Sequence, residues 1–326
     1  MMDEMLPADA VSHFSAVLAQ EEFRAELDRL FLSEWHWGTP QEVRLRPLKA
    51  HKERCTFEIR VRTENGWHSV IGKVDTIDRS DVFAAMQAIV RSGFGPKAAF
   101  AIPLPLAYLP LLHVLFEENV QGRWALEVFL NGGPDEQLET ARRCGAWLAQ
   151  FHTSAPRLGN RDEPGGLLPQ IDYWAEQIKG SGELLSTKCE LLLRKLDAAM
   201  PAEGTLEFCP GHGSYIPQHV FLSGRRTITI DLDKYDLADP GRDLALFVVS
   251  LQRLGLRQSG SLRARDMAVD AFLQAYASDR PVEALKHLAF FKAAECLHRA
   301  HRDLYKRTTP IPSWACIMLE EGLRAL

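Results

Sequence analysis

The stretch GHGSYIPQHVFLSGRRTITIDLDKYDLADPGRDLA, residues 211–245, concentrates the side chains of this chain that are best suited to catalysis. It contains two short apolar runs, 220–222 and 227–232, and the Ser-Gly-Arg between them predicts a small hairpin. Polar residues flank this hairpin, namely His212, Ser214 and His219 before it and Asp231 and Asp233 after it. Because the two strands of a hairpin run back to back, we expect these flanking side chains to converge in space.

The aspartates after the hairpin have different interpretations. Residues two apart on a strand point to the same face, so Asp231 and Asp233 could share a divalent cation. Asp239 directly precedes Pro240, which is typical of a helix N-cap followed by proline at the first helical position. We therefore expect a helix to begin at Pro240.

The chain before this stretch changes its periodicity several times. Residues 8–35 carry apolar side chains at helical spacing, which predicts a leading helix. Apolar and polar residues alternate at 55–61, and the following Asn65-Gly66 is a strong hairpin signal. The other elements expected here are a strand at 67–74, a helix at 80–92 and strand-like runs at 98–109 and 112–118. Prolines in the 98–109 run indicate an edge or interrupted strand.

Beyond Gly122 the pattern becomes mostly helical, apart from the hairpin. We expect helices at 135–153, 170–199, 240–256, 264–278 and 281–307. This order predicts an α+β fold of two lobes. The N-terminal lobe, 1–118, would hold a small antiparallel sheet, and the C-terminal lobe, 119–326, would be larger and helical.

Composition narrows the class of protein further. The chain has 326 residues, a formal net charge of -5, 46% hydrophobic residues and 25% charged residues, as ordinary globular proteins do. The mild charge disfavours nucleic acid as the main partner, because affinity for a phosphate backbone depends on clustered Lys and Arg. The six cysteines form no C-x-x-C pair, which favours buried thiols in a reducing compartment. We find no secretory signal and no membrane span, and we expect a cytoplasmic protein.

The motifs resemble, in order and spacing, those of the aminoglycoside and choline phosphotransferases, a superfamily with a protein-kinase-like fold. That superfamily carries H-G-D-x-x-x-x-N, a hairpin, I-D-x-D/E and then D-P-x-x-D-L-A. The corresponding residues here are His212-Gly213-Ser214, His219, Ile230-Asp231-Leu232-Asp233 and Asp239-Pro240 with Asp243-Leu244-Ala245. Three other segments also match the family pattern. Ile71-Gly72-Lys73-Val74 resembles the strand of the nucleotide-binding lysine, Glu117-Glu118 the hinge between the lobes, and Leu148 to His152 the helix ending in L-x-x-L-H.

The resemblance implies ATP and Mg²⁺ as cofactors. Lys73 would hold the α- and β-phosphates, and Asp231 would hold the metal. Asp233 would be either a second metal ligand or a structural acceptor. It is also a candidate catalytic residue, if its carboxylate reaches the acceptor hydroxyl. His212 and Asp243 would brace the catalytic loop.

The nucleotide-binding segments depart from the family pattern in two places. The loop expected to cover the phosphates, RPLKAHKER at 46–54, contains no glycine. It offers Lys49 and Lys52, which either clamp phosphates by charge or belong to a solvated basic turn. The helix at 80–92 supplies no obvious glutamate for Lys73. Glu118, at the hinge, is the remaining candidate nucleotide contact.

The segment that matches the catalytic motif differs from the family pattern at Ser214 and His219. Ser214 stands where the family has the aspartate that accepts or orients the acceptor proton, and a serine hydroxyl is a poor base. His219 stands where the family has an asparagine metal ligand, and imidazole favours transition metals over Mg²⁺. His219 is therefore a metal ligand, a general base or a structural histidine.

Three functions follow from these residues. The first is an ATP-dependent phosphotransferase that moves the γ-phosphate to a hydroxyl of a small molecule or peptide. The second is a pseudokinase-like module that binds a nucleotide or ligand without phosphotransfer. The third, nucleotidyl transfer, has no positive sign in the sequence. The acceptor region also shows no dense acidic cluster of the kind that a polycationic aminoglycoside would need.

Overall fold

The structure is a computed structural model that describes residues 18–50, 53–202, 204–280 and 282–326. The chain divides into two compact units, Met1–Gln121 and Gly122–Leu326. The division falls after Gln121, whereas the sequence pattern placed it after Glu118. The two units have separate cores, and each is described on its own below.

The N-terminal unit contains a five-stranded antiparallel sheet in the order β1-β2-β3-β6-β5. The strands are β1 Glu42–Ala50, β2 Arg54–Thr63, β3 Gly66–Asp75, β5 Pro105–Leu109 and β6 Val114–Glu118, and a two-residue strand β4, Phe100–Ala101, precedes β5. The predicted hairpin at Asn65-Gly66 is confirmed, and so is the interrupted edge strand at 98–109. Strand β1 was missed, because it is an edge strand whose side chains are mostly exposed and show no half-buried alternation.

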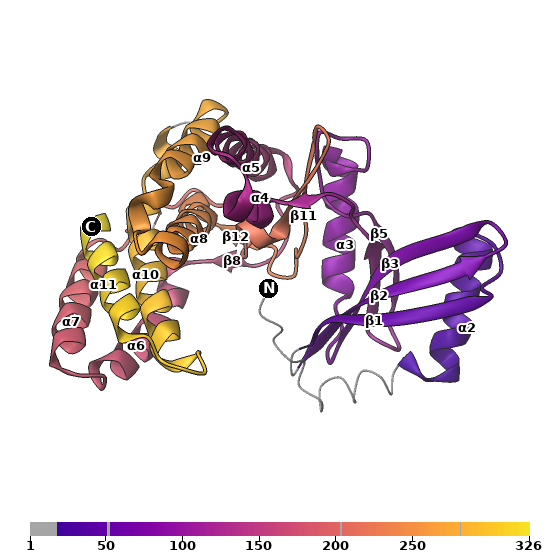
Figure 1. The fold of residues 1–326 in the computed structure, drawn as a ribbon, viewed down its shortest axis with the longest axis horizontal. Coiled ribbons are helices and arrows are strands. Elements are labelled where there is room, and N and C mark those ends of the chain that lie inside the picture. The colour runs from indigo at the N-terminus through magenta and orange to yellow at the C-terminus, as the bar shows by residue number, and fades with distance from the viewer. Residues whose placement is uncertain (1–17, 51–52, 203, 281) are drawn as a thin grey trace. The chain divides into compact units, whose positions relative to one another are not determined.

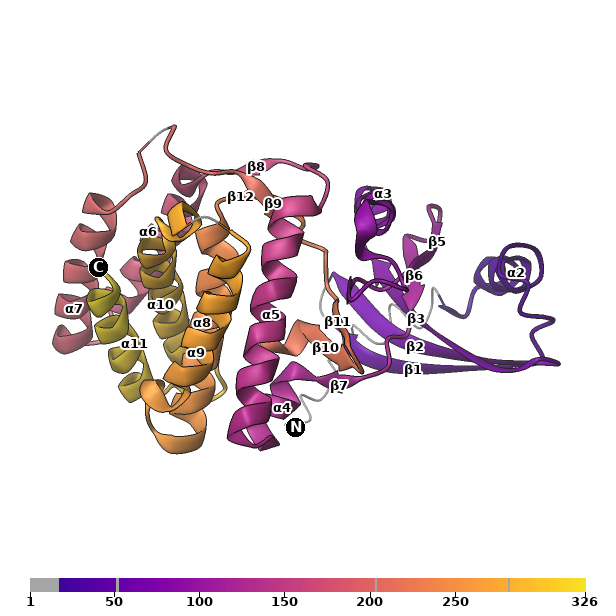
Figure 2. The same cartoon turned by 90° about the horizontal axis from the view of Figure 1, so that it is seen from above.

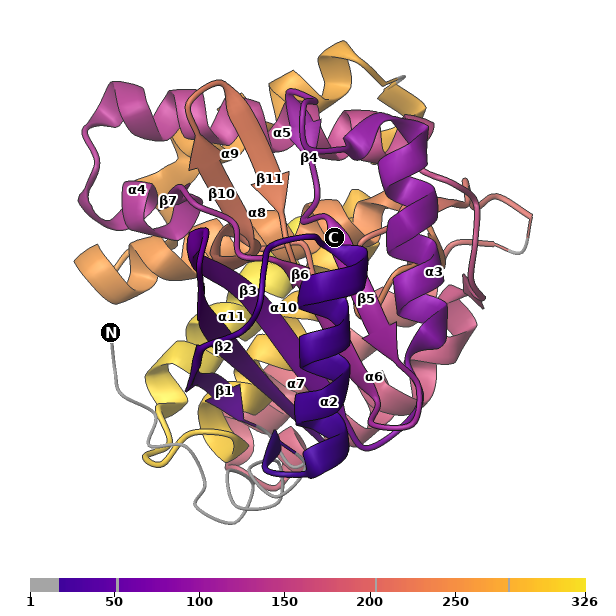
Figure 3. The same cartoon turned by 90° about the vertical axis from the view of Figure 1, so that its right-hand side faces the viewer.

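Two helices accompany this sheet. Helix α2, Glu21–Arg29, continues into a π-helical turn at Leu30–Glu34, which confirms the predicted leading helix over 21–34; the prediction was wrong at 19–20, where the helix is interrupted and Gln20 is extended, and positions 8–17 lie outside the described residues. Figure 3 shows α2 crossing the sheet, and its Phe23 and Leu27 share a buried core with the sheet residue Phe57. Helix α3, Ser80–Ile89, packs beside β5, where the ring of Phe83 stacks on that of Tyr108.

The C-terminal unit is mainly helical. Its helices are α4 Ala125–Asn131, α5 Pro134–Ser154, α6 Pro164–Lys179, α7 Glu183–Ala198, α8 Pro240–Ser259, α9 Asp266–Ser278, α10 Leu288–Tyr305 and α11 Pro312–Ala325. The prediction of one helix at 170–199 was wrong, because the chain turns at 180–182 with Gly182 at φ 113°. The helix predicted at 281–307 begins only at Leu288, and α4 and α11 were not predicted.

Two groups of helices form the core of this unit. Helices α6, α7, α10 and α11 lie side by side in Figures 1 and 2, and with α8 they bury one large apolar cluster. Helix α5 packs closely on α9, since a Cβ at Gly145 would lie 2.3 Å from the carbonyl oxygen of Phe272. Tyr215 stacks between Trp147 of α5 and Phe247 of α8. This stack fixes the backbone next to Ser214.

Short strands bring together the loops between the helices. The predicted hairpin is confirmed as β10 Val220–Ser223 and β11 Arg226–Thr229, and β7 Arg123–Trp124 pairs with β10. A second small sheet has the order β8-β12-β9, built from Arg161–Asp162, Asp236–Ala238 and Cys209–Gly211. The six cysteines are free thiols, and all but the half-buried Cys316 are buried, as the sequence predicted. Within the described ranges, no helix is long and apolar enough to cross a membrane.

Candidate active site

Two loops of the C-terminal unit meet at the candidate site. The loop 212–219 follows β9, and the segment 230–235 follows β11. They touch at Gly213, whose φ is 74° and where an added Cβ would lie 2.4 Å from the carbonyl oxygen of Lys234. Glycine is therefore required here both by the left-handed backbone and by the lack of space.

Asp243 holds the first of these loops in place. Its carboxylate is buried and accepts hydrogen bonds from the backbone N–H groups of His212, at 2.7 Å, and Gly213, at 2.9 Å. Nε2 of His152 lies 3.3 Å away. Burial alone would raise the pKa of Asp243, but the hydrogen bond from His152 and the nearby Arg242 outweigh it and hold the pKa well below its usual range. Asp243 is thus a buried anion that braces the loop, as the resemblance implied.

Helix α8 carries this brace and begins as predicted. Asp239 is the N-cap, its side chain accepts from the N–H of Gly241 at 2.8 Å, and Pro240 is the first helical residue. The other carboxylate oxygen of Asp239 lies 2.7 Å from Nδ1 of His287. The capped N-terminus therefore presents Asp243 at the positive end of the helix dipole.

His212 links the two loops. Its Nε2 lies 3.0 Å from the carbonyl oxygen of Ile230, which can only accept, so Nε2 carries the proton and Nδ1 is an acceptor. The N–H of Ser214 donates to that Nδ1 at 3.3 Å. Burial lowers the pKa of His212 to about 4, so the ring is neutral at pH 7.

The hydroxyl of Ser214 is engaged by the loops themselves. Oγ donates to the carbonyl oxygen of Asp231 at 3.1 Å and also lies 3.3 Å from Nδ1 of His212. A hydroxyl has one proton to donate. The geometry therefore favours a role for Ser214 in joining the two loops over a role in removing a proton.

His219 and Asp231 face each other at the outer edge of this framework. Nδ1 of His219 donates to the carbonyl oxygen of Ser214 at 2.8 Å, and Nε2 lies 3.2 Å from Oδ2 of Asp231. Their side chains are 15% and 28% exposed, in contrast to the buried His212 and Asp243. Asp231 also has a φ of 69°, and such strained non-glycine residues are concentrated at functional sites.

One premise of the sequence analysis was wrong. Strand β11 ends at Thr229, so Asp231 and Asp233 do not lie on a strand and are not held to one face by its pleat. Asp233 lies in the turn that leads to Lys234. A shared cation site for the two aspartates therefore cannot be argued from strand geometry.

The residues present fit a divalent cation, but they do not favour Mg²⁺ as the family pattern does. The Asp231 carboxylate suits Mg²⁺ or Mn²⁺, whereas the Nε2 of His219 suits transition metals. Within the described part of the chain, no three or more His, Cys, Asp or Glu side chains form a metal-binding group. A cation here would need phosphate oxygens and water as its remaining ligands.

The N-terminal unit provides a buried ion pair. Nζ of Lys73 on β3 lies 3.1 Å from Oε2 of Glu117 on the neighbouring β6, and the two side chains are 8% and 5% exposed. The glutamate partner therefore comes from a strand, whereas the sequence analysis looked for it in the helix at 80–92. The preceding Gly72 is required by packing, because an added Cβ would lie 2.4 Å from the ring of Phe57.

The other predicted nucleotide contacts are Glu118, Lys49 and Lys52, and none of them takes part in the ion pair between Lys73 and Glu117 as the structure describes it. The Glu118 carboxylate accepts a hydrogen bond from the N–H of Leu104 at 3.2 Å. Lys49 is exposed on β1, opposite Thr56, so it belongs to a strand and not to a phosphate-covering loop. Lys52 lies outside the described residues.

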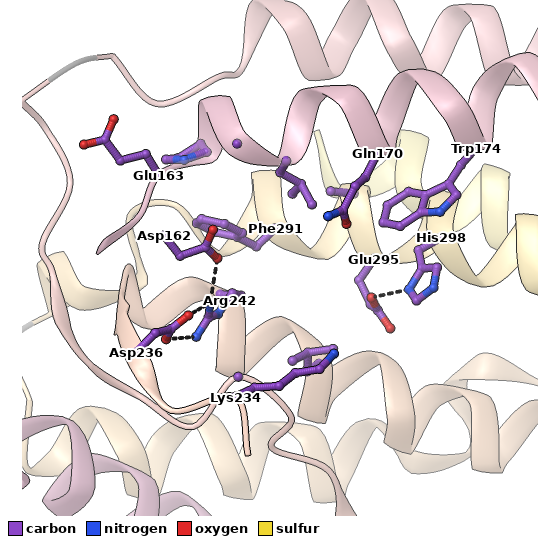
Figure 4. Close-up of a pocket in the computed structure, with 16 residues that line it drawn as sticks. Asp162, Glu163, Gln170, Trp174, Lys234, Asp236, Arg242, Phe291, Glu295 and His298 are labelled. Carbon is purple, nitrogen blue, oxygen red and sulfur yellow. Dashed lines mark hydrogen bonds and ion pairs between the residues drawn. The ribbon is translucent and has the colours of Figure 1, made fainter. Parts of the chain in front are cut away.

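A cavity of about 460 Å³ opens within the C-terminal unit beside the candidate site (Figure 4). Gly213 and Lys234, from the two loops, form part of its lining. Helices α6 and α10 contribute Trp174, Phe291 and Glu295. Sequence reasoning missed this cavity, because most of its lining residues lie outside the stretch 211–245 and are dispersed along the chain.

The two units, with a lysine-bearing sheet in one and a braced loop beside a hairpin in the other, define a protein-kinase-like phosphotransferase fold. The model of the phosphotransferase enzyme family (APH) matches residues 28–285, and the chain belongs to this family. Among curated protein sequences, none matches this chain significantly.

Solved structures support the fold. A putative aminoglycoside phosphotransferase from Ralstonia eutropha is 13% identical with a TM-score of 0.61, covering 93% of this chain and 97% of that one. A choline/ethanolamine kinase family protein from Mesorhizobium loti is 16% identical with a TM-score of 0.58, covering 94% of each chain. A phosphotransferase, APH(2″)-IIa, in complex with streptomycin and ATP, is 12% identical with a TM-score of 0.54, covering 94% of this chain and 96% of that one.

Proposed function

We propose that this protein transfers the γ-phosphate of ATP to a hydroxyl group of a small molecule or peptide. The observation that carries the proposal is the braced loop, in which a buried Asp243 fixes the backbone that sets His219 against Asp231. Membership of the phosphotransferase enzyme family supports the same reaction class.

Each functional residue has a role in this proposal. Lys73 neutralises the nucleotide phosphates, and Asp231 with His219 holds the divalent cation. The cation, when bound, supplies further charge neutralisation. The acceptor lies in the cavity beside Gly213, which brings its hydroxyl next to the loop.

At the γ-phosphorus, the reaction forms one bond and breaks one. The acceptor oxygen bonds to the γ-phosphorus, the bond from phosphorus to the β–γ bridging oxygen breaks, and ADP leaves. The hydroxyl proton passes to Asp233 or to solvent. Phosphoryl transfer has a loose transition state, so the absence of a carboxylate at position 214 slows the reaction without preventing it.

A second candidate function is a nucleotide- or ligand-binding module without phosphotransfer. One observation favours it, namely that the Ser214 hydroxyl is engaged by the carbonyl of Asp231. In this alternative ATP binds, but no acceptor is phosphorylated.

Isothermal titration with ATP tests nucleotide binding, the step that both candidate functions require. We expect binding that requires Mg²⁺ or Mn²⁺ and that is lost in Asp231→Ala, whereas Asp172→Ala, at an exposed position of α6, binds as the wild type does. ADP release during an acceptor screen then separates the two functions. A folded protein that does not bind millimolar ATP would contradict both.

A further inference from the structure

The cavity in the C-terminal unit has a charge pattern that indicates its ligand, and this inference rests on the proposed phosphotransfer function. Four carboxylates line the cavity, which at first suggests a cationic acceptor. Their partners decide whether they are available to a ligand. Figure 4 shows these side chains together.

Arg242 engages two of the four carboxylates. Its guanidinium lies 2.6 Å from Asp162 and 2.5 Å from Asp236. Burial alone would lower the pKa of Arg242, but the hydrogen bond to Asp236 and the charges of the nearby carboxylates together outweigh it and raise that pKa, so the arginine stays charged. A third carboxylate, Glu163, points away from the other labelled side chains in Figure 4.

Glu295 is the fourth carboxylate, and its own helix neutralises it. Nε of Arg299 lies 2.5 Å from Glu295, and Nδ1 of His298 lies 3.1 Å from it. Burial alone would raise the pKa of Glu295, but the charge of Arg299 and the hydrogen bond with His298 together outweigh it and lower the pKa. The ring of His298 stacks on Trp174 at 4.4 Å, so this end of the cavity presents a flat aromatic surface.

Lys234 differs from Arg242, because no carboxylate among the described residues pairs with its ammonium group. Its side chain extends from the loop on the opposite side of the cavity from Gln170 and Trp174 (Figure 4). Across the residues that the structure describes, the Lys234 ammonium takes part in no hydrogen bond or ion pair. It thus offers the cavity an uncompensated positive charge, next to Gly213 of the catalytic loop.

We propose that the acceptor carries an anionic group, a carboxylate or a phosphate ester, that binds to Lys234 close to the hydroxyl that receives the phosphate. An ammonium at this point also screens the repulsion between the anionic acceptor and the nucleotide phosphates. The rest of the acceptor lies against Trp174. A purely cationic acceptor would meet three carboxylates that arginines already engage and a fourth, Glu163, that points away, together with an unpaired lysine.

Saturation-transfer NMR with matched probes tests this without relying on turnover. The probes are glycerate against glycerol, 4-hydroxybutyrate against 1,4-butanediol, and choline as a cation. We expect saturation transfer to the two hydroxy acids and little to their neutral partners or to choline. Lys234→Met should weaken hydroxy-acid binding about tenfold, whereas Lys234→Arg should retain most of it. Lys286→Met, at an exposed site outside the cavity, is the control.

Two results would overturn the proposal. One is binding of choline or the neutral alcohols that equals or exceeds binding of the hydroxy acids. The other is hydroxy-acid binding unchanged in a folded Lys234→Met variant. ATP titration of the same samples separates this inference from the proposed function. Loss of ATP affinity in Lys234→Met, with hydroxy-acid binding intact, would assign Lys234 to the nucleotide and reject it as the acceptor site.

Discussion

Nε2 of His219 lies 3.2 Å from Oδ2 of Asp231, so a cation bound by this carboxylate would also meet the imidazole ring. Because Nδ1 of His219 donates to the carbonyl of Ser214, Nε2 is the atom left to face a cation. Imidazole nitrogen prefers transition metals to Mg²⁺. We therefore expect ATP to bind more tightly with Mn²⁺ than with Mg²⁺.

The His219→Asn variant should reverse this preference. An amide oxygen suits Mg²⁺, so the affinity for ATP with Mg²⁺ should rise by about tenfold relative to that with Mn²⁺. Titration calorimetry with each metal measures the effect, and His36→Asn, at an exposed histidine, serves as control. Equal affinities with both metals, unchanged in His219→Asn, would show that His219 does not ligate the cation.

Ser214→Ala separates a loop-holding serine from a catalytic one. Loss of the 3.1 Å hydrogen bond to Asp231 should lower the free energy of unfolding by about 1 kcal/mol. The rate of ADP formation should fall by less than about tenfold, whereas loss of a general base costs about 10²–10⁴-fold. A loss of that larger size would assign proton transfer to Ser214, if Ser214→Ala is as stable as the control variant Ser259→Ala.

Local signals accounted for much of the fold. Asn65-Gly66 marks the turn between β2 and β3, and Asp239-Pro240 specifies a helix start, so both elements were predicted correctly. The missed elements lack such signals. The break between α6 and α7 depends on Gly182 at a positive φ inside an otherwise continuous apolar pattern, and β1 buries too little of its surface to show a period.

The candidate site was less accessible to sequence reasoning. Motif spacing identified His219 and Asp231 as candidate residues. It did not predict that β11 ends at Thr229 or that Asp231 has a left-handed backbone conformation. Glu117 was recognised only as part of a hinge, because its pairing with Lys73 depends on which strands are neighbours. A glutamate at an inward position of the apolar run 114–118 was the signal that was available.

Glu117→Gln tests whether Glu117, from strand β6, is the functional ion-pair partner of Lys73. Removing the charge of Glu117 weakens the compensation of the buried Lys73 ammonium, so we expect ATP affinity to fall about tenfold and the free energy of unfolding to fall by a few kcal/mol. Calorimetry and urea unfolding measure the two effects. Glu58→Gln is the matched control, since its ion pair with the exposed Arg46 should contribute less than about 1 kcal/mol. Equal effects in the two variants would contradict the assignment.

The brace at Asp243 should be essential to folding as well as to activity. Asp243→Ala removes the acceptor of two buried backbone N–H groups and of His152, which should lower the free energy of unfolding by about 3–5 kcal/mol. Asp233→Ala, at a half-buried turn position, should cost less stability. Denaturant unfolding of both variants measures the difference, and similar midpoints would show that Asp243 is not a structural anchor.

His212 should make stability depend on pH in the weakly acidic range. Burial lowers its pKa from 6.5 to about 4, so between these values the unfolded chain binds a proton that the folded chain does not. Stability should therefore decline as the pH falls from about 7 to 4, by at most about 3 kcal/mol from this residue, and His212 should contribute no further change below that. His212→Gln keeps a donor for the Ile230 carbonyl but cannot titrate, so its unfolding midpoint should vary less with pH. Parallel pH profiles for the two proteins would mean that the pKa of His212 is not lowered in the folded state.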